Sequence, residues 1–424
     1  MAAHEAQVKI GVIGAGVAGM TAAYLLGKRH EVTLIERNDY IGGHTNTIIV
    51  QEEGRGLPVD TGFIVCNPRT YPFFYRLLGE WGVSLRDSDM SFGFCCERSG
   101  LGYVGPSVRE FLRKPSNLFD FRLLGMIREQ RRFGRRAAAD LERGRLEGLM
   151  LGEYLRQIGA SSFFIENYLI PIAAAVWSSP DTDMSRFPAH TFIRFLANHG
   201  MLILRHRPTW QTVVGGSSTY VEAFRSRFRG RVLTKAPVRS VKRADDGVSV
   251  SVEGRDTEQF DYVVLATHAD ESLAMLAAAT AEERDALSAW RYWENDVQLH
   301  TDAGVMPADR RLWASWNYHR RADADPTKPL TMTYFMNRLQ GLRSKRDYLV
   351  SLNAGERIDP DEIIYSVTYT HPGYTSRSIE AQRELREMNG SRRTFFCGAY
   401  MRYGFHEDAV VSAVDVARHF GIDL

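Results

Sequence analysis

Two short apolar runs near the start of the chain enclose one apolar helical segment. Residues 8–13 read Val-Lys-Ile-Gly-Val-Ile, residues 20–27 are apolar over about two helical turns, and residues 31–35 form a second short run. Runs of strand length on either side of a helix are typical of parallel strands. The pattern therefore predicts a βαβ unit at the N-terminus.

The turn between the first strand and the helix carries the spacing G-x-G-x-x-G. Gly14 allows a tight turn, Gly16 lets the backbone approach a pyrophosphate, and Gly19 permits close packing of the helix on the strand. Val17 and Ala18 open the helix, whose N-terminus offers unpaired N–H groups and a positive dipole end to phosphates. Strand, turn and helix in this order predict a dinucleotide site.

The second strand leads to Glu36, about twenty residues beyond the glycines, where an acid accepts the ribose hydroxyls. Arg37 follows, and the double glycine Gly42-Gly43 and His44 stand a few residues further on. A second close approach of the backbone suits FAD, whose pyrophosphate needs it. The spacing G-x-G-x-x-G recurs at Gly100, Gly102 and Gly105, but no apolar strand leads directly into it, as one does before Gly14, so no separate NAD(P) site is expected.

Later segments carry strand and helix patterns of the same kind. Residues 262–266 and 394–397 are apolar runs of strand length, and residues 409–420 read as a helix. Glu407 and Asp408 precede this helix, and acids are favourable at a helix start.

The acid, the double glycine and these later segments resemble the flavin-containing amine oxidase superfamily. In that family an arginine commonly follows the two glycines, and here His44 takes its place. The resemblance implies that the C-terminal helix points its N-terminus at the flavin pyrimidine and stabilises negative charge on the reduced flavin. It also implies FAD contacts beyond the N-terminal fingerprint, namely Thr61, Gly62, Phe63, Val238, Gly398, Phe405, Glu407, Asp408, Ala409 and Val410.

The resemblance covers both ends and the middle of the 424 residues, a length that predicts two packed domains. It implies an α/β fold with a Rossmann-type, glutathione-reductase-like FAD-binding domain. An amine-oxidase-like substrate domain, with a mixed sheet and helices, interrupts this domain. Residues 1–70, 205–290 and 371–424 are assigned to the FAD-binding domain, and residues 71–204 and 291–370 to the substrate domain.

A basic segment at residues 109–145 carries eleven Lys or Arg residues and five acids, with Phe and Leu residues between them. A basic helix with one apolar face can lie on an anionic membrane. The alternative is a solvated arginine-rich face above an ordinary core contact. The apolar segments 168–177 and 192–204 leave a similar choice between an acyl-chain tunnel and buried helices.

A closer resemblance runs through nearly the whole chain. It is carried by PVDTGFIVCN, SDMSFGF, RPTWQTVVGGSSTYVEAF, LHTDAGVMP, HPGY and FCGAYMRYGFHEDAVVSAVDVA. These motifs are similar to those of the flavin domain fused to plant cyclopropane fatty acid synthases, and of bacterial flavoproteins associated with acyl-chain methyltransferases, including those of furan fatty acid biosynthesis. The resemblance implies a methyl-branched or unsaturated acyl chain on a phospholipid as substrate, dehydrogenation as reaction, and an acyl-chain methyltransferase as partner.

Flavin dehydrogenation needs a C–H bond about 3–3.5 Å from flavin N5 and, where an acidic proton leaves, a base. His406 and His300 are the candidate bases, and Tyr71 is a candidate proton carrier. Many amine oxidases hold a water with a lysine, but residues 295–300 contain none, which argues against a plain amine-oxidase mechanism. Hydride or radical abstraction from an allylic C–H needs side chains only to position the substrate and to exclude water.

Two other functions remain open: an amine or polycyclic oxidase, and a non-redox flavoprotein such as a mutase, an isomerase or a scaffold. Acids facing the flavin would indicate an amine, paired arginines a sugar-nucleotide diphosphate, and a long apolar tunnel beside the basic segment a lipid.

Composition and charge bear on four further classes of protein: nucleic-acid-binding, metal-binding, secreted and membrane-spanning. The net charge of +2 gives no argument for nucleic acid, and the four cysteines lack the spacing of a metal site. The N-terminus lacks a secretory signal, and no apolar run reaches the ~20 residues of a membrane span. A cytoplasmic protein that can sit peripherally on the inner face of the membrane is expected.

Overall fold

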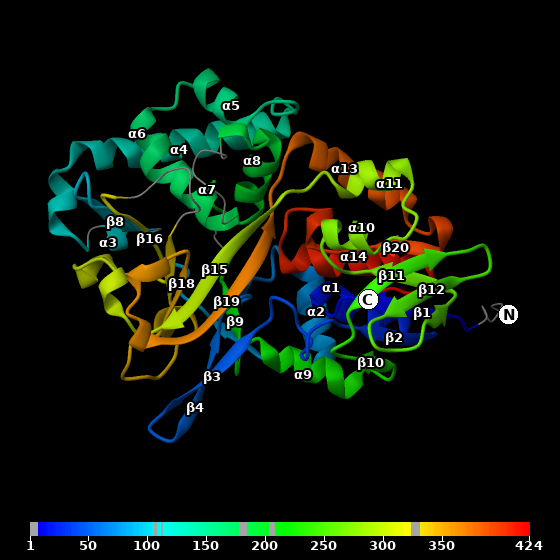
Figure 1. The fold of residues 1–424 in the computed structure, drawn as a ribbon. Coiled ribbons are helices and arrows are strands. Elements are labelled where there is room, and N and C mark those ends of the chain that lie inside the picture. Colours follow the sequence, from blue (N-terminus) through cyan, green and yellow to red (C-terminus); the bar gives the residue numbers. More distant parts are fainter. Residues whose placement is uncertain (1–6, 106–107, 112, 178–184, 203–207, 324–330) are drawn as a thin grey trace.

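The computed structural model describes residues 7–105, 108–111, 113–177, 185–202, 208–323 and 331–424. Leu112 of the basic segment and the end of the apolar segment 192–204 therefore lie outside the described residues. The described chain forms two units that lie side by side (Figure 1).

A parallel sheet of five strands forms the centre of the first unit. Its order is β10 (Arg231–Leu233), β2 (Glu31–Ile35), β1 (Lys9–Ile13), β14 (Tyr262–Leu265) and β20 (Thr394–Phe396). Successive side chains of a strand point to opposite faces. Ile10 and Val12 of β1 therefore pack against one layer and Ile13 against another.

Helices cover one face of this sheet, and a second sheet covers the other. The Ile10 side packs against α1 (Val17–Leu26), α9 (Ser218–Arg227) and α14 (His406–His419). The Ile13 side packs against an antiparallel sheet and three helices: β11 (Val238–Arg243), β12 (Val248–Val252), β13 (Glu258–Phe260), α10 (Ala269–Met275), α11 (Ala281–Leu287) and α13 (Ser376–Met388).

The helix α2 (Pro72–Trp81) also belongs to the core of the first unit. Phe74 and Trp81 are buried together with Tyr220 of α9, and the rings of Trp81 and Tyr220 are 6.4 Å apart. The domain boundary predicted at residue 71 therefore falls too early, because the apolar side of α2 packs against the dinucleotide-binding unit.

A mixed sheet of seven strands forms the second unit. Its order is β19 (Ile363–Pro372), β15 (Tyr292–His300), β18 (Leu349–Leu352), β17 (Met332–Phe335), β16 (Trp316–Arg320), β7 (Phe92–Cys96) and β8 (Leu101–Gly105). Only β7 and β16 pair in parallel among these neighbours. Helices gather beside this sheet (Figure 1): α3 (Val108–Phe111), α4 (Phe121–Glu142), α5 (Leu151–Gln157), α6 (Ser162–Phe164), α7 (Ile170–Trp177) and α8 (Ala189–Asn198).

The basic segment folds mainly into α4. Asp120 caps this helix by accepting hydrogen bonds from the N–H groups of Arg122 and Leu123. The buried stripe of α4 recurs every three or four residues, as in an amphipathic helix: Leu123, Met126, Gln130, Phe133, Gly134, Ala137, Asp140 and Leu141. The arginines lie on the exposed side, so the helix combines a core contact with a basic surface.

Short elements join the two units: the hairpin of β3 (Thr47–Glu52) and β4 (Arg55–Asp60), the small sheet of β5 (Val65–Cys66), β9 (Gln211–Val213) and β6 (Leu85–Asp87), and α12 (Met336–Leu339). Asp60 is fully buried at this junction. Its carboxylate accepts from the Ser217 N–H at 2.8 Å and from the Gln340 amide at 2.7 Å, which ties α9 to the second unit. Burial raises the pKa of Asp60 to about 6.

The architecture is the predicted α/β one: a Rossmann-type unit interrupted by a mixed sheet with helices. Among the helices of the described chain, none combines the length and the apolar character needed to cross a membrane.

Candidate functional site

One cavity of about 1000 Å³ runs from the parallel sheet into the second unit. Its first part is lined by the loops that follow β1, β2, β14 and β20. Ligands of open α/β sheets bind outside the carboxyl ends of the strands, so a dinucleotide is expected here. The predicted cofactor residues that line this part are Gly14, Gly16, Val17, Ala18, Glu36, Arg37, Gly42, Gly43, His44, Thr61, Gly62, Phe63, Val238, Gly398, Phe405 and Ala409.

The glycine turn presents backbone to the cavity. Gly14 has φ = 96°, and a Cβ there would lie 2.7 Å from the carbonyl oxygen of Ala266. A Cβ at Gly43 would lie 3.1 Å from Cα of Gly16, whereas a Cβ at Gly16 would meet nothing within 4 Å. The space beside Gly16 is thus open to a ligand. Gly19 does not line the cavity but packs against the Gly14 carbonyl, which is the helix–strand contact predicted for it.

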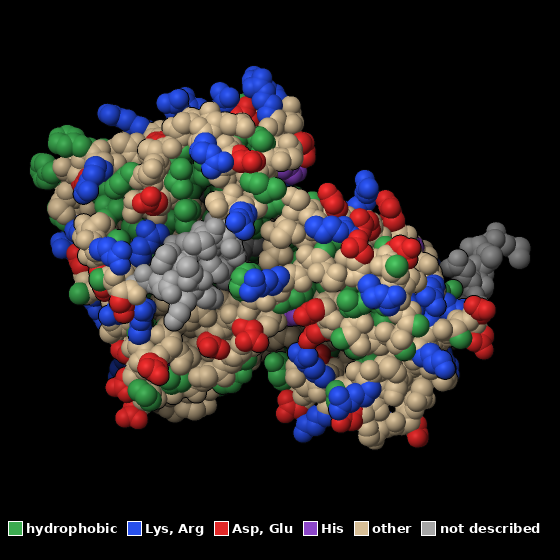
Figure 2. Space-filling view, turned by 45° about the horizontal axis from the view of Figure 1, so that its top comes forward, with side chains coloured by type: hydrophobic (Ala, Val, Ile, Leu, Met, Phe, Trp, Pro, Cys, Tyr) green, Lys and Arg blue, Asp and Glu red, His purple; other side chains and the backbone are tan. Residues whose placement is uncertain are grey.

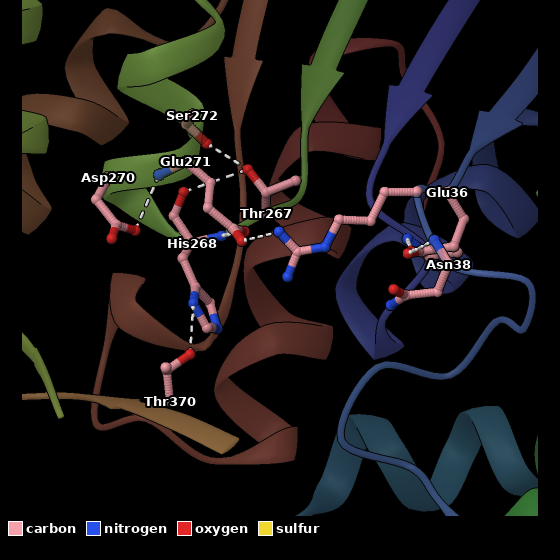
Figure 3. A network of polar contacts seen from close by, with 10 residues as sticks. Glu36, Asn38, Thr267, His268, Asp270, Glu271, Ser272 and Thr370 are labelled. Atoms are coloured by element: carbon pink, nitrogen blue, oxygen red, sulfur yellow. Dashed lines mark hydrogen bonds and ion pairs between the residues drawn. The ribbon is translucent and has the colours of Figure 1, made fainter. Parts of the chain in front are cut away.

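Glu36 lies beside the turn, at the end of β2. Its carboxylate accepts hydrogen bonds from the N–H groups of Ala15 and Asn38, each at 2.9 Å (the Asn38 contact is drawn in Figure 3). A carboxylate has about four lone-pair sites, so acceptor capacity remains for ribose hydroxyls. Arg37 is paired with Glu271 at 2.6 Å, and both side chains line the cavity.

The loop 61–63 lies against the backbone of His44. The N–H of Phe63 donates to the His44 carbonyl at 2.9 Å, and a Cβ at Gly62 would overlap that same carbonyl. The Thr61 hydroxyl is 3.2 Å from the hydroxyl of Tyr369 on β19. This loop therefore brings the strand of the second unit to the wall of the dinucleotide site.

Three histidines, His44, His268 and His371, gather where the two units meet. The ring of His44 lies 6.0 Å from that of His268 and 5.5 Å from that of His371. Burial and the neighbouring histidine lower the pKa of His371 to about 4, and burial holds the pKa of His44 well below its usual range. These rings are neutral at pH 7. His44 Nε2 is buried with no hydrogen-bond partner in the described chain, so it can contact a bound ligand.

The N-terminus of α14 reaches the cavity through Phe405, His406 and Ala409. The His406 ring stacks on Phe63 with centroids 3.7 Å apart, and its Nε2 is 3.0 Å from the hydroxyl of Tyr220. Burial lowers the pKa of His406 to about 3, so the ring is uncharged at neutral pH.

The two acids of α14 have structural roles. Glu407 accepts from the N–H groups of Phe73 and Phe74 at 3.0 and 2.9 Å and so caps α2, and Asp408 caps its own helix. Val410 is fully buried in the core. Glu407, Asp408 and Val410 do not line the cavity, because the first turn of a helix points only some of its side chains at a ligand. The predicted cofactor contacts of these three residues stay a prediction.

The second part of the cavity lies among the seven-stranded sheet and the helices beside it. Its side chains are mostly apolar or aromatic and come from distant parts of the sequence: Met90, Phe92, Tyr103, Val104, Phe111, Met126, Ile127, Tyr168, Ile172, Val176, Phe195, Met201, Trp210, Val297, Trp316, Tyr334, Leu352 and Val367. The acids in the described lining are Glu36 and Glu271, both at the dinucleotide end.

Two of the three candidate catalytic residues, His406 and Tyr71, line the cavity. His300 does not: it is buried on β15, and its Nε2 is 2.8 Å from the Ser351 hydroxyl. Burial lowers the pKa of His300 to about 4. The prediction of His300 as a base is corrected, because β15 points this side chain into the sheet core rather than at the cavity.

Sequence reasoning missed His268, His371 and Tyr369, which line the cavity, and Tyr220, whose hydroxyl contacts His406. His371 and Tyr369 alternate on β19 toward the cavity, and His268 follows β14. A histidine directly after the strand next to the fingerprint strand was a usable signal for His268. Nothing local marks the others, because their proximity depends on how the two units meet.

These observations fit FAD. The first turn of α1 has no side-chain cap at Gly16, so its N–H groups are free for a pyrophosphate. The open space at Gly16, the acceptor capacity of Glu36 and the unpartnered His44 Nε2 lie along the same cavity.

The family model of flavin-containing amine oxidoreductases matches residues 17–295. Among curated proteins, AofH of Mycobacterium tuberculosis, named as a flavin-containing monoamine oxidase, is 28% identical over 268 residues, which are 61% of this chain and 56% of AofH. The chain thus spans just over half of that relative.

Solved structures resemble the chain over almost its whole length. A CLA-producing fatty acid isomerase from P. acnes has a TM-score of 0.69 at 17% identity, over 97% of this chain and 98% of the isomerase. A putrescine oxidase variant has a TM-score of 0.68 at 16% identity, over 97% and 98% of the two chains. At these identities the likeness concerns the fold.

The fold and the dinucleotide cavity define a flavin-dependent oxidoreductase of two units. The chain belongs to the flavin-containing amine oxidoreductase family. The predicted cofactor, FAD, and the predicted class, an FAD-dependent oxidoreductase, are confirmed by this membership.

Proposed function

We propose that the protein is an FAD-dependent oxidoreductase that dehydrogenates a fatty acyl chain, methyl-branched or unsaturated and carried by a phospholipid. The observation that carries the proposal is the second part of the cavity. Its described lining is mostly apolar and aromatic, with Gln130, Arg131 and His199 among the polar exceptions, and it extends as far as α4. An acyl chain has no polar group along its length. Its transfer from water into such a lining is therefore favourable and leaves no polar group without a hydrogen-bond partner.

The described lining of the second part of the cavity offers an amine aromatic rings but no carboxylate, and it offers a diphosphate one arginine rather than a pair. An amine is a cation at pH 7, and its burial needs a partner of opposite charge or a cage of rings. The acids of the described lining, Glu36 and Glu271, stand at the dinucleotide end. A sugar-nucleotide diphosphate needs paired arginines. The described lining has Arg37 in the first unit, paired with Glu271, and Arg131 on α4.

The residues of the chain supply position and dryness in this proposal. FAD, when bound, supplies the acceptor for a hydride or an electron from the C–H bond. Tyr71, Trp210 and Phe405 all line the cavity, and the rings of Tyr71 and Trp210 lie 6.3 Å apart. Aromatic side chains of this kind help to keep water from a bound substrate. His406, with its pKa near 3, is a weak base at neutral pH, and we assign it to contact with the cofactor rather than to proton transfer.

The comparisons support both this proposal and one rival. The fold neighbour from P. acnes is a fatty acid isomerase, so the fold is compatible with an acyl substrate. The match to AofH favours amine oxidation as the second candidate. An acyl-chain methyltransferase partner, implied by the sequence resemblance, stays a prediction.

Anaerobic mixing of the FAD-loaded protein with candidate substrates tests the proposal. Oxidised flavin absorbs near about 450 nm and bleaches on reduction, a property of the cofactor itself. We expect bleaching with detergent-dispersed phospholipid that carries methyl-branched or unsaturated chains, and none with putrescine or other primary amines. Bleaching by amines alone would reject the acyl substrate.

Mass analysis of the lipid separates dehydrogenation from isomerisation. Dehydrogenation removes two hydrogens per chain and leaves the flavin reduced in the absence of oxygen. Isomerisation changes no mass and returns the flavin to its oxidised form. A product of unchanged mass with oxidised flavin would replace the proposed reaction by an isomerase activity on the same substrate.

A further inference from the structure

Three large apolar side chains are exposed where the basic segment begins. Leu118, Phe119 and Phe121 have 50%, 80% and 84% of their surface exposed, and the two phenylalanines exceed every other large apolar residue of the described chain. Leu118 and Phe119 end a short 3₁₀ turn, and Phe121 opens α4. We call these three residues the apolar tip. Figure 2 shows hydrophobic side chains protruding at the left end of the molecule, where Figure 1 places α3 and the start of α4.

Arginines of α4 lie on the same side as the apolar tip. Arg128, Arg132 and Arg135 follow Phe121 by seven, eleven and fourteen residues, spacings that keep side chains on one side of an α-helix. All three are exposed. In the described chain no acid forms an ion pair with them, whereas Arg136 on the flank pairs with Asp140 at 2.6 Å. This basic arc has unneutralised charge.

The cavity reaches the same helix. Met126, Ile127, Gln130 and Arg131 of α4 line its far part, and Arg131 is exposed to solvent as well. Phe121 of the apolar tip, the basic arc and part of the cavity lining therefore lie on one helix, and Leu118 and Phe119 directly precede it. A ligand with an apolar chain and an anionic head group matches these surfaces: the chain suits the apolar side chains, and the head group suits the arginines.

We infer that the apolar tip and the basic arc dock the protein on the surface of a lipid bilayer that contains anionic phospholipids. The tip enters the boundary between headgroups and acyl chains, and the arc binds lipid phosphates. This inference rests on the proposed function only for the claim that the acyl chain passes from the bilayer into the cavity.

Size and charge favour a bilayer over a protein as the occupant. Phe119 and Phe121 can bury about 150–250 Å² each, and with the smaller Leu118 the total stays well below the ~1,200 Å² of a specific protein interface. A symmetric dimer through this surface would place the basic arc against its own copy or beside it, since such an interface uses the same patch twice. An anionic bilayer meets both the apolar tip and the positive charge.

Co-sedimentation of the FAD-loaded protein with vesicles tests the inference. We expect binding to phosphatidylcholine vesicles that contain phosphatidylglycerol, weaker binding to pure phosphatidylcholine, and a decrease as salt is raised. The double variant Phe119→Ser/Phe121→Ser should lower the binding constant at least about tenfold. Arg128→Gln and Arg132→Gln should each lower it about fivefold.

Matched control variants keep the test specific. Ile49→Ser replaces an apolar residue that is 55% exposed on β3, away from the tip, and Arg383→Gln replaces an exposed arginine on α13. Both should bind vesicles like the parent protein. Because all the substituted side chains are exposed, unchanged melting and unchanged FAD content are expected for every variant.

Three outcomes separate the inference from the proposed function. Flavin reduction by detergent-dispersed lipid that persists in the Phe119→Ser/Phe121→Ser variant, with loss only on vesicles, supports both. Vesicle binding that follows the tip and the arc, without flavin reduction by any lipid, supports docking and rejects the proposed substrate. Equal vesicle binding by the parent and the tip variant overturns docking, as does a dimer that the tip variant converts to a monomer in sedimentation velocity.

Discussion

The two parts of the cavity are built in opposite ways. At the dinucleotide end the wall is backbone: Gly14, Gly42 and Gly43 have φ values of 96°, 130° and 60°, which only glycine adopts readily. At the other end the wall is side chains, mostly aromatic and aliphatic, from strands and helices of the second unit and from the segments that join the units. A backbone wall fixes one cofactor through short local motifs, whereas a side-chain wall can change its substrate residue by residue.

The largest effect is expected where a side chain is added to the backbone wall. Gly16 has φ = −70°, so other residues fit its conformation, and a Cβ there meets nothing within 4 Å. Gly16→Leu should therefore fold and fill the space of the pyrophosphate. We expect a colourless protein with FAD affinity lowered at least about 100-fold, or about 2.8 kcal/mol, measured by flavin fluorescence titration.

Two further glycine variants serve as comparisons for Gly16→Leu. Gly19→Ala puts a Cβ onto the Gly14 carbonyl and should lower stability as well as FAD binding. Gly125→Ala, on α4 with open space around it, should leave FAD binding unchanged and should not lower stability. A yellow Gly16→Leu protein with normal affinity would show that the cofactor does not lie against the turn.

A charge added to the side-chain wall should spare FAD and damage turnover. Ile172 on α7 lines the cavity and is half-buried. Ile172→Asp places a carboxylate against the acyl chain, at a cost of roughly 2–3 kcal/mol, so kcat/KM should fall about 30–150-fold. Stopped-flow flavin reduction with dispersed lipid measures this effect.

The matched variant Ile172→Val removes one methylene and should change kcat/KM by no more than about tenfold. FAD content should equal that of the parent in both variants. Unchanged lipid turnover in Ile172→Asp, or a new preference for amines at no loss of lipid turnover, would contradict the assignment of this wall to the acyl chain.

The pH dependence of stability should also distinguish the two parts of the cavity, because buried histidines lie around the dinucleotide end. The pKa of His371 is lowered to about 4 from an ordinary value near 6.5. The unfolded chain therefore binds this proton first, so the stability that neutral His371 contributes is present above pH 6.5 and is lost as pH falls toward 4. Acidification from pH 7 to pH 5 should cost about 2 kcal/mol at this site.

Urea unfolding of the FAD-loaded protein at pH 7 and pH 5 measures the loss. In His371→Gln the amide can still meet Asn295, which lies 3.1 Å from the imidazole, but it does not titrate. The difference between pH 7 and pH 5 should shrink by about 2 kcal/mol in this variant. An equal difference in both proteins would place the acid sensitivity elsewhere.

The same contrast explains how much the sequence could predict. The strands β1 and β2, the glycine turn and Glu36 follow from local pattern, because a βαβ unit sets their geometry within a few dozen residues. The strand β14 was predictable as an apolar run, but not from that unit. The helix α14 was predictable as an element, but the direction of Glu407 was not, since it depends on the N-terminus of α2. The lining of the substrate part needs contacts between residues as distant as Phe92 and Trp316, which no local pattern contains.

Substitution of His300 should give the smallest effect on kcat/KM. It also tests whether a residue that local pattern favours as a base has that role in the folded protein. Its type and its strand favour a catalytic base, yet its ring is buried with Ser351 and lies outside the described lining of the cavity. His300→Gln should leave kcat/KM within about twofold and reduce the free energy of unfolding by about 1–2 kcal/mol through the altered hydrogen bond. His406→Gln, inside the cavity, should instead shift the flavin spectrum and weaken FAD binding about tenfold, equal to about 1.4 kcal/mol. The contrary outcome is a His300→Gln protein that keeps its FAD and its fold but loses flavin reduction. That result would show that His300 takes part in proton transfer although it lies outside the described lining of the cavity.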